Sequence, residues 1–388
     1  MSRTAAFLLL ASITVSFLAG SSAATPLYPL YMAQWGLTPL MITVIFGIYA
    51  LAVLLALLVA GRLSDHLGRR PVLLTAALAQ AATMVLFATA TSLAGLLFAR
   101  VVQGLTTGAA IGAVGAAMID LDKARGTVAN AVAPPFGTAT GALIAGILVQ
   151  YLPFPTQLVY AVFGAVFILQ AVGLAFMRES ISARSGVLAS LKPRLSLPPA
   201  TREPLLVALP VLVAVWALGG FYGSLAPMLV RSMLGSNSAL LGGLSLFVLA
   251  ACGGLSVLAF QHREPKDMMM FGVASLFVGV AIAVLSLPYS AVAVFFLGTA
   301  IAGVGFGTGF QGAVRTVVPF AAPHERAGVL SIVFIISYIA MGVPAVIAGW
   351  MIAQHGNIIA TAQIFGAVIM ALACLALLGR ASRAWSYA

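Results

Sequence analysis

The segment GRLSDHLGRRPVLL, residues 61–74, places several charged side chains between glycines in a chain that otherwise carries little charge. Only 7% of all residues are charged, yet this segment contains Arg62, Asp65, His66, Arg69 and Arg70. Apolar stretches precede and follow it, at 39–60 and 72–92. Each is about 20 residues long, which is the length a helix needs to cross a bilayer. The segment is therefore predicted to be a short polar turn between two membrane spans.

The composition extends this prediction to the whole chain. Of its 388 residues, 62% are hydrophobic, and the mean hydropathy is +1.13. A soluble protein has about 25% charged residues, so a soluble fold is excluded. Apolar stretches predict helices at 6–32, 39–60, 72–92, 95–118, 127–151, 157–177, 205–229, 237–260, 268–288, 290–314, 327–352 and 357–379. We expect an all-α, multi-pass membrane protein with 12 transmembrane helices.

The distribution of basic residues predicts the topology. The chain has 19 Lys and Arg against 8 Asp and Glu, a net charge of +11. With the N-terminus in the cytoplasm, every Lys and Arg except Arg100 and Arg231 falls at the cytoplasmic side, as the positive-inside rule requires. We therefore expect both termini in the cytoplasm of a bacterial-type inner membrane. The basic charge then faces membrane lipid and implies no nucleic-acid partner.

Two segments help to divide the chain. The first span, with Arg3 before it and Ser22-Ala23-Ala24 at its end, is similar to a cleavable leader, but its apolar stretch is longer, and we expect it to be retained. A basic, proline-containing stretch at 178–203 is predicted to link an N-terminal bundle, 1–177, to a C-terminal bundle, 204–388. Within it, 185–197 is predicted as a short amphipathic surface helix.

Three motifs identify a family. Gly61, Leu63, Asp65, Gly68, Arg69, Arg70 and Leu74 match G-x-L-x-D-x-x-G-R-R-x-x-x-L, the loop motif of the major facilitator superfamily, which the chain resembles. Arg100, Gln103 and Gly104 match its R-x-x-Q-G motif. Gly20, Pro26 and Pro29 are similar to the G-x5-P-x-x-P of twelve-helix drug–proton antiporters. The fifth predicted helix has Gly137, Gly141 and Gly146 but lacks the Gly-Pro pair of antiporters.

The resemblance implies a fold of two pseudo-symmetric six-helix halves that alternate access to a midplane site. It also implies a conformational switch at the first motif, formed by Gly61, Asp65, Gly68, Arg69, Arg70 and Asp120. Asp65 is expected near the positive end of the predicted helix 327–352, which begins after Arg326. Arg69 and Arg70 are expected to pair with Asp120 or Asp122. The alternative is that these are ordinary solvated loop charges.

Arg100 is predicted to lie several residues inside a span, where a charge costs at least about 2.5–3.5 kcal/mol. Three roles remain open: binding substrate anions, biasing the proton affinity of a neighbour, or bonding to carbonyls of the first helix. The candidates for proton coupling or substrate contact are Arg100, Gln103 and Asp120. The acids, none at mid-helix, are Asp65, Asp120, Asp122, Glu179, Glu203, Glu264, Asp267 and Glu325. Proton coupling of transport therefore uses Asp120, uses an unusual mechanism, or is absent.

Aromatic, amide and hydroxyl side chains are the candidates for the substrate cavity. They lie on predicted helices that face the central pathway in the superfamily, and the alternative is ordinary packing. These residues are Tyr28, Tyr49, Thr107, Trp216, Tyr222, Phe306, Gln311 and Tyr338. Such walls suit amphipathic ligands, because they offer apolar surface with few polar points.

The expected function is efflux of small amphipathic organic compounds by a monomeric secondary transporter, as in multidrug resistance. Antiport against protons, with no bound cofactor, is expected to drive it. The alternative is an uptake permease or facilitator for a small anionic metabolite. A membrane enzyme is disfavoured, because no nucleophile, acid–base or metal constellation stands in the helices. Cys252 and Cys374 lie in apolar runs and are expected to be small buried hydrophobes.

Overall fold

The computed structural model describes residues 1–181, 184–193, 195–235 and 238–378, and within these it consists of helices without any strand. The chain folds into two compact units, which are described separately. Unit 1 comprises Met1–Leu37 and Ile48–Pro193, and unit 2 comprises Thr38–Gly47 and Arg194–Ala388. Twelve helices of the described residues are long and apolar enough to cross a membrane, as the sequence predicts.

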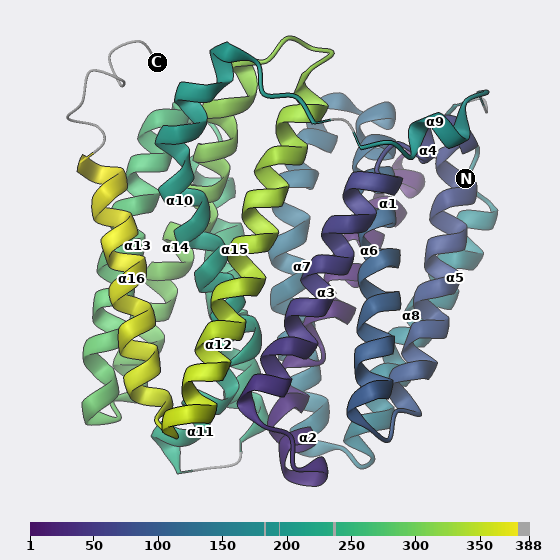
Figure 1. Ribbon diagram of the computed structural model, residues 1–388. Helices are drawn as coiled ribbons and strands as arrows, with labels where there is room; N and C mark the ends of the chain where they lie inside the picture. Colours follow the sequence, from purple (N-terminus) through teal and green to yellow (C-terminus); the bar gives the residue numbers. More distant parts are fainter. Residues whose placement is uncertain (182–183, 194, 236–237, 379–388) are drawn as a thin grey trace. The chain divides into compact units, whose positions relative to one another are not determined.

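The helices of unit 1 follow the predicted spans closely (Figure 1). The last part of α3 belongs to unit 1 and its first part to unit 2. The elements are α1 (Arg3–Ser22), η1 (Thr25–Leu27), α2 (Tyr28–Trp35), α3 (Pro39–Ala60), α4 (Ser64–Leu67), α5 (Arg69–Ala88), α6 (Leu93–Leu121), α7 (Lys123–Tyr151), α8 (Pro155–Ala175) and α9 (Val187–Ser190).

Unit 2 contains the remaining helices. They are α10 (Pro199–Ser224), α11 (Ala226–Leu234), α12 (Ala239–Phe260), α13 (Pro265–Ser286), η2 (Leu287–Tyr289), α14 (Val292–Val317), η3 (Val318–Phe320), α15 (Arg326–His355) and α16 (Ile358–Leu378). Two differences from the predicted boundaries stand out: the first predicted helix, 6–32, is divided into α1, η1 and α2, and α10 begins at Pro199 and not at 205. Proline is favoured in the first turn of a helix, where no intrahelical N–H bond is lost.

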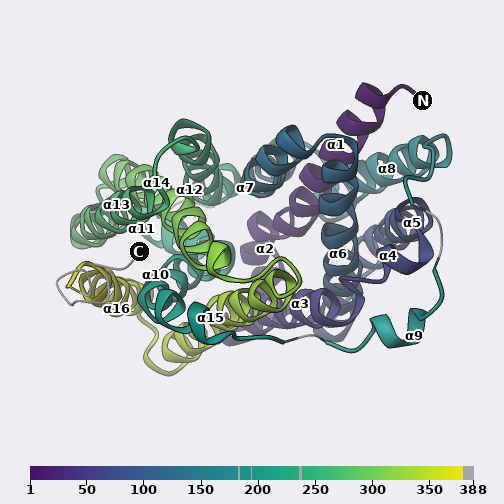
Figure 2. The ribbon, with the colours of Figure 1, turned by 90° about the horizontal axis from the view of Figure 1, so that it is seen from above.

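The two units use the same helix pairings. In unit 1, α1 packs against α6, α7 and α8, and α5 packs against α6 and α8 (Figure 2). In unit 2, α10 packs against α14, α15 and α16, and α13 packs against α14 and α16. Corresponding spans therefore make corresponding contacts, as expected of the two pseudo-symmetric halves that the resemblance implies.

The linker packs partly on unit 1. Arg184 donates its backbone N–H to the carbonyl of His66 at 2.8 Å, and His66 Nδ1 lies 3.0 Å from the carbonyl oxygen of Ser185. Only Val187–Ser190 of the predicted surface helix at 185–197 is helical among the described residues. The N-terminal part of the linker is therefore held against the turn that carries the first motif.

Candidate functional site

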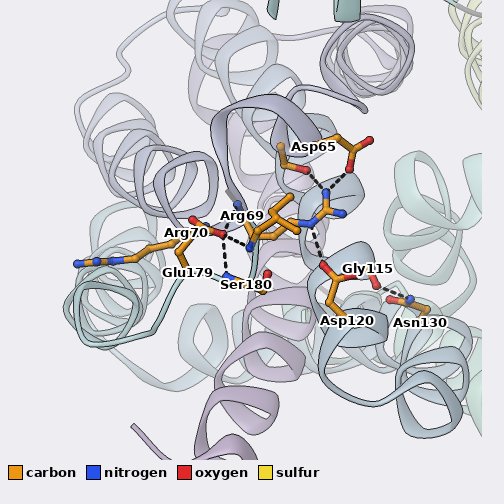
Figure 3. A network of polar contacts seen from close by, with 10 residues as sticks. Asp65, Arg69, Arg70, Gly115, Asp120, Asn130, Glu179 and Ser180 are labelled. Atoms are coloured by element: carbon orange, nitrogen blue, oxygen red, sulfur yellow. Dashed lines mark hydrogen bonds and ion pairs between the residues drawn. The ribbon is translucent and has the colours of Figure 1, made fainter. Parts of the chain in front are cut away.

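The turn between α3 and α5 centres on Arg69, whose side chain is buried in unit 1. Its Nη1 donates to Asp65 Oδ1 at 2.5 Å and to Ser64 Oγ at 2.7 Å, and its Nε donates to Asp120 Oδ2 at 3.1 Å (Figure 3). We call Ser64, Asp65, Arg69 and Asp120 the Arg69 cluster. It joins α4 and the start of α5 to the end of α6. Arg69 therefore pairs with two of the acids that the sequence analysis singles out.

A third acid, Glu179, holds the first turn of α5. Its Oε1 accepts the backbone N–H of Arg69 at 2.9 Å, and its Oε2 accepts that of Arg70 at 2.9 Å (Figure 3). Carboxylates are favoured at helix N-termini, where N–H groups have no intrahelical partner. Sequence reasoning missed Glu179, because it lies 110 positions from Arg69 along the chain.

The glycines of the motif allow these close contacts. Gly68 has φ of +103°, and a Cβ there would lie 2.6 Å from Glu179 Oε2. A side chain at this position would be strained and would displace the carboxylate. Gly61 and Gly112 of α6 lie against each other, since a Cβ on Gly112 would be 3.4 Å from the Gly61 Cα. The turn thus lies directly on α6.

Arg70 and Asp122 take other partners than the expected pairing. The Arg70 side chain donates to the carbonyls of Leu174 and Ala175 at the end of α8. Asp122 caps α7 by accepting the backbone N–H of Arg125 at 3.0 Å, and its carboxylate lies 3.7 Å from the Arg125 guanidinium. Both residues therefore secure helix ends within unit 1, and neither joins the Arg69 cluster.

Arg100 lies in α6 with 1% of its surface exposed, and its guanidinium is bonded to α1 and α2. Its Nη1 donates to the Ser21 carbonyl at 2.9 Å and to Gln103 Oε1 at 2.6 Å. Its Nη2 donates to the Tyr28 hydroxyl at 2.6 Å. Gln103 in turn donates Nε2 to the Gly20 carbonyl at 3.1 Å. This is the geometry of the third role left open by the sequence, bonding to carbonyls of the first helix.

Aromatic rings complete the Arg100 surroundings. The guanidinium carbon lies 5.8, 5.2 and 5.6 Å from the ring centroids of Tyr28, Tyr49 and Phe87. Rings at such distances stabilise a desolvated cation. Tyr49 also donates its hydroxyl to Ser21 Oγ at 2.9 Å. Tyr28, Tyr49 and Thr107 are all buried in unit 1, and the two tyrosines lie against the Arg100 guanidinium.

The cavity candidates of unit 2 fall into two groups. Tyr222 is buried, with its hydroxyl 2.7 Å from Thr299 Oγ1. Trp216, Phe306, Gln311 and Tyr338 are partly exposed. The Trp216 ring centroid lies 5.3 Å from that of Phe310 and 5.2 Å from that of Tyr338, so α10, α14 and α15 share one aromatic surface. We call Trp216, Phe310 and Tyr338 the unit 2 aromatic cluster.

Titratable groups are scarce around this cluster. Among the described residues of unit 2, the charged side chains stand at the ends of helices or in the connections, and none lies near the middle of a span. The same described part of the chain holds no group of three or more His, Cys, Asp or Glu residues able to bind a metal. The cluster can therefore offer apolar surface and neutral hydrogen-bonding groups.

A family model described as Major Facilitator Superfamily matches residues 10–343. The chain belongs to this superfamily. Members of the superfamily are transporters, so the chain is a multi-pass membrane transporter of small molecules and not an enzyme. Among curated proteins, no sequence matches it.

Solved structures of superfamily transporters have the same fold. A bacterial homologue of the human lysosomal transporter Spinster, in an inward-facing and occupied conformation, has a TM-score of 0.74 at 14% identity, covering 97% of this chain and 96% of that chain. The nucleoside transporter NupG has a TM-score of 0.71 at 12% identity, with 97% and 99% covered. The human organic anion transporter MFSD10 (TETRAN) has a TM-score of 0.68 at 17% identity, with 97% and 100% covered.

The Arg100 network predicts that Arg100→Lys destabilises the transporter. A lysine ammonium cannot reach Ser21, Gln103 and Tyr28 together, so buried acceptors are left unpaired. We expect a loss of about 3–5 kcal/mol in the free energy of unfolding, measured by thermal unfolding in detergent. Arg231→Lys, outside this network, is the control. Wild-type stability in Arg100→Lys, together with lost transport, would instead assign Arg100 to the substrate.

Proposed function

We propose that this transporter exports small amphipathic organic compounds by alternating access, in antiport with protons. The observation that carries the proposal is the unit 2 aromatic cluster, which is partly exposed and has no charge beside it at mid-span among the described residues. Flat apolar compounds gain both area burial and ring contacts on such a surface. Gln311, also partly exposed on α14, can fix the polar end of such a compound.

The buried charge of unit 1 supports the same substrate class. A substrate anion would have to compete with Ser21, Gln103 and Tyr28 for the Arg100 guanidinium. Those bonds, at 2.6–2.9 Å, lie inside a packed bundle. We therefore assign Arg100 and Gln103 to the integrity of unit 1, and the substrate to neutral and aromatic side chains.

The Arg69 cluster is proposed as the conformational switch and the point of proton coupling. Arg69 faces both Asp65 and Asp120, so a proton on either acid removes a partner charge from the guanidinium. Asp120 is an acid at the end of a span and not at its middle. Coupling through it would therefore act on the connection between α4, α5 and α6, which rearranges when access alternates.

A second candidate function is uptake of a small anionic metabolite without proton coupling. The observation that favours it is the lack of a carboxylate at mid-span in any described helix. Two relatives in fold, named as transporters of nucleosides and of organic anions, make this candidate worth a direct test. In either case we propose a monomer in the cytoplasmic membrane with both termini in the cytoplasm.

Dyes of different charge separate the two candidates. Nile red is uncharged, ethidium is a cation and fluorescein is an anion. In bacterial cells that lack their main efflux pumps, we expect the transporter to lower the accumulation of Nile red or ethidium, and a protonophore to abolish the difference. Raised accumulation of fluorescein that persists with the protonophore would support uptake and contradict export.

Removing the central ring of the aromatic cluster should weaken substrate binding. We expect Trp216→Ala to raise the KM for an exported dye about tenfold, since buried aromatic anchors contribute most to binding energy. Trp350→Ala is the matched control, because Trp350 is 50% exposed on α15. An unchanged KM in Trp216→Ala, with Trp350→Ala also unchanged, would remove the cluster from the substrate site.

Neutralising the exposed acid of the switch should affect transport more than folding. The Asp65 side chain is 46% exposed, so Asp65→Asn leaves little buried charge unpaired. We expect the variant to fold and reach the membrane at wild-type levels but to transport about tenfold more slowly or less. Asp122→Asn, at a helix cap outside the cluster, is the control. Wild-type transport rates in Asp65→Asn would contradict the switch.

A further inference from the structure

Gln80 of α5 is a buried amide that the fold leaves without a partner. It is 0% exposed, and no described residue bonds to its Oε1 or Nε2. The other buried glutamines of unit 1 differ from it. Gln103 bonds to Arg100 and Gly20, and Gln170 bonds to Ser16 Oγ at 2.8 Å and Ser12 Oγ at 3.2 Å. An unsatisfied amide inside an apolar bundle costs several kcal/mol, so Gln80 needs a partner outside the protein chain.

Helix geometry places a second buried polar group, Thr107, opposite Gln80. Phe87 lies seven residues after Gln80 on α5, and Thr107 lies seven residues after Arg100 on α6. Seven residues are about two turns, so each pair shares a face, and each step covers about 10 Å. The helices α5 and α6 are consecutive, antiparallel and packed together, and the Arg100 guanidinium lies 5.6 Å from the Phe87 ring. One step of two turns from this contact leads to Gln80 on α5 and to Thr107 on α6. The two residues are therefore at the same depth in the bundle, on the faces that α5 and α6 turn toward each other.

Thr107 is the second buried polar group of this region. It is 1% exposed, and its Oγ1 interacts with the Tyr49 hydroxyl, which itself donates to Ser21 Oγ at 2.9 Å. Thr83 of α5 donates back to a carbonyl one turn earlier at 2.8 Å, whereas Thr107 makes no such bond within α6. A hydroxyl has one donor and two acceptor positions, so Thr107 can bond to a further partner, as can the Gln80 amide.

Gly20 of α1 provides the third wall of this region. A Cβ built on Gly20 would lie 4.0 Å from Gln80 Nε2 and 3.0 Å from Phe167 Cζ, and the Gly20 carbonyl accepts from Gln103. The absence of a side chain at Gly20 thus lets the Phe167 ring and the Gln80 amide come close to the backbone of α1. This gives a physical role to the first glycine of the G-x5-P-x-x-P pattern, which the efflux proposal does not use.

We propose that water, one molecule or a short chain, binds inside unit 1 between Gln80 and Thr107, beside Gly20. Water is the ligand that fits, because Gln80 presents both a donor and an acceptor, and Thr107 presents a hydroxyl that can do either. Buried waters commonly make about three hydrogen bonds to otherwise unsatisfied polar groups. The site is a hydrated point within an otherwise apolar bundle, adjoining the buried Arg100 charge.

Apolar substitutions of similar shape test this through the sign of a stability change. If water bridges the two side chains, Gln80→Met and Thr107→Val each strand it, and each lowers the Tm in detergent by about 2 °C or more. The double variant then falls by less than the sum, because both changes remove the same bridge. If the region is dry, each substitution removes an unsatisfied polar group and raises the Tm.

Gln170→Met is the matched control, since it removes an amide whose partners are protein hydroxyls and should lower the Tm in either case. Rises in Tm for Gln80→Met and Thr107→Val, or falls that simply add, would overturn the bridge.

A measurement on the unchanged protein provides a test even if these variants do not fold. X-ray radiolysis in ¹⁸O-labelled water oxidises side chains next to bound water, so Phe167, 0% exposed beside Gly20, should take up ¹⁸O. Labelling of Phe167 no greater than that of Phe295, 2% exposed in unit 2, would also overturn it.

Discussion

A full charge inside an apolar bundle must be compensated by the protein itself, and in this transporter Nη1 and Nη2 of Arg100 do so by bonding α6 to α1 and α2, while Nε has no partner among the described residues. The bonds to Ser21, Gln103 and Tyr28 fix the depth of α1 against α6. The rings of Tyr49 and Phe87 bring α3 and α5 to the same point. Removing the partners of such a cation costs more free energy than the intact bonds contribute, because the charge is then left unpaired in a medium without water.

The two units differ in where their polar groups lie. Unit 1 holds two polar networks, one around Arg100 and one around Arg69. In both, the guanidinium group joins neighbouring helices by hydrogen bonds. The partly exposed groups of unit 2 are aromatic rings and an amide, with the charges of its described residues at helix ends. In the function that we propose, substrate recognition by a neutral surface and conformational control by charge are located in different parts of the chain.

Much of the fold follows from sequence, because span length and loop charge are imposed by the bilayer and act locally. The sequence pattern places the start of α10 too late, because Pro204 reads as a helix breaker although α10 continues through it. The candidate sites are harder to predict, since they depend on which residues of different helices meet. Arg69 and Asp65 are four residues apart, so their contact can be expected from the sequence. Glu179 meets Arg69, and Gln80 comes close to Gly20, only when helices distant in sequence pack together. Residue type showed that Arg100 matters, but its three possible roles differ only in the identity of its neighbours.

The most direct test of the account is the fluorescence of Trp216 in a variant in which Trp35, Trp350 and Trp385 are replaced by phenylalanine. Trp216 is then the only tryptophan, and its emission reports what lies against the aromatic cluster. Addition of an exported dye to the purified protein should change this emission saturably, with a half-saturation concentration equal to the KM of transport. Unchanged Trp216 emission, in a variant that still transports the dye, would contradict the assignment of the substrate to the neutral surface of unit 2.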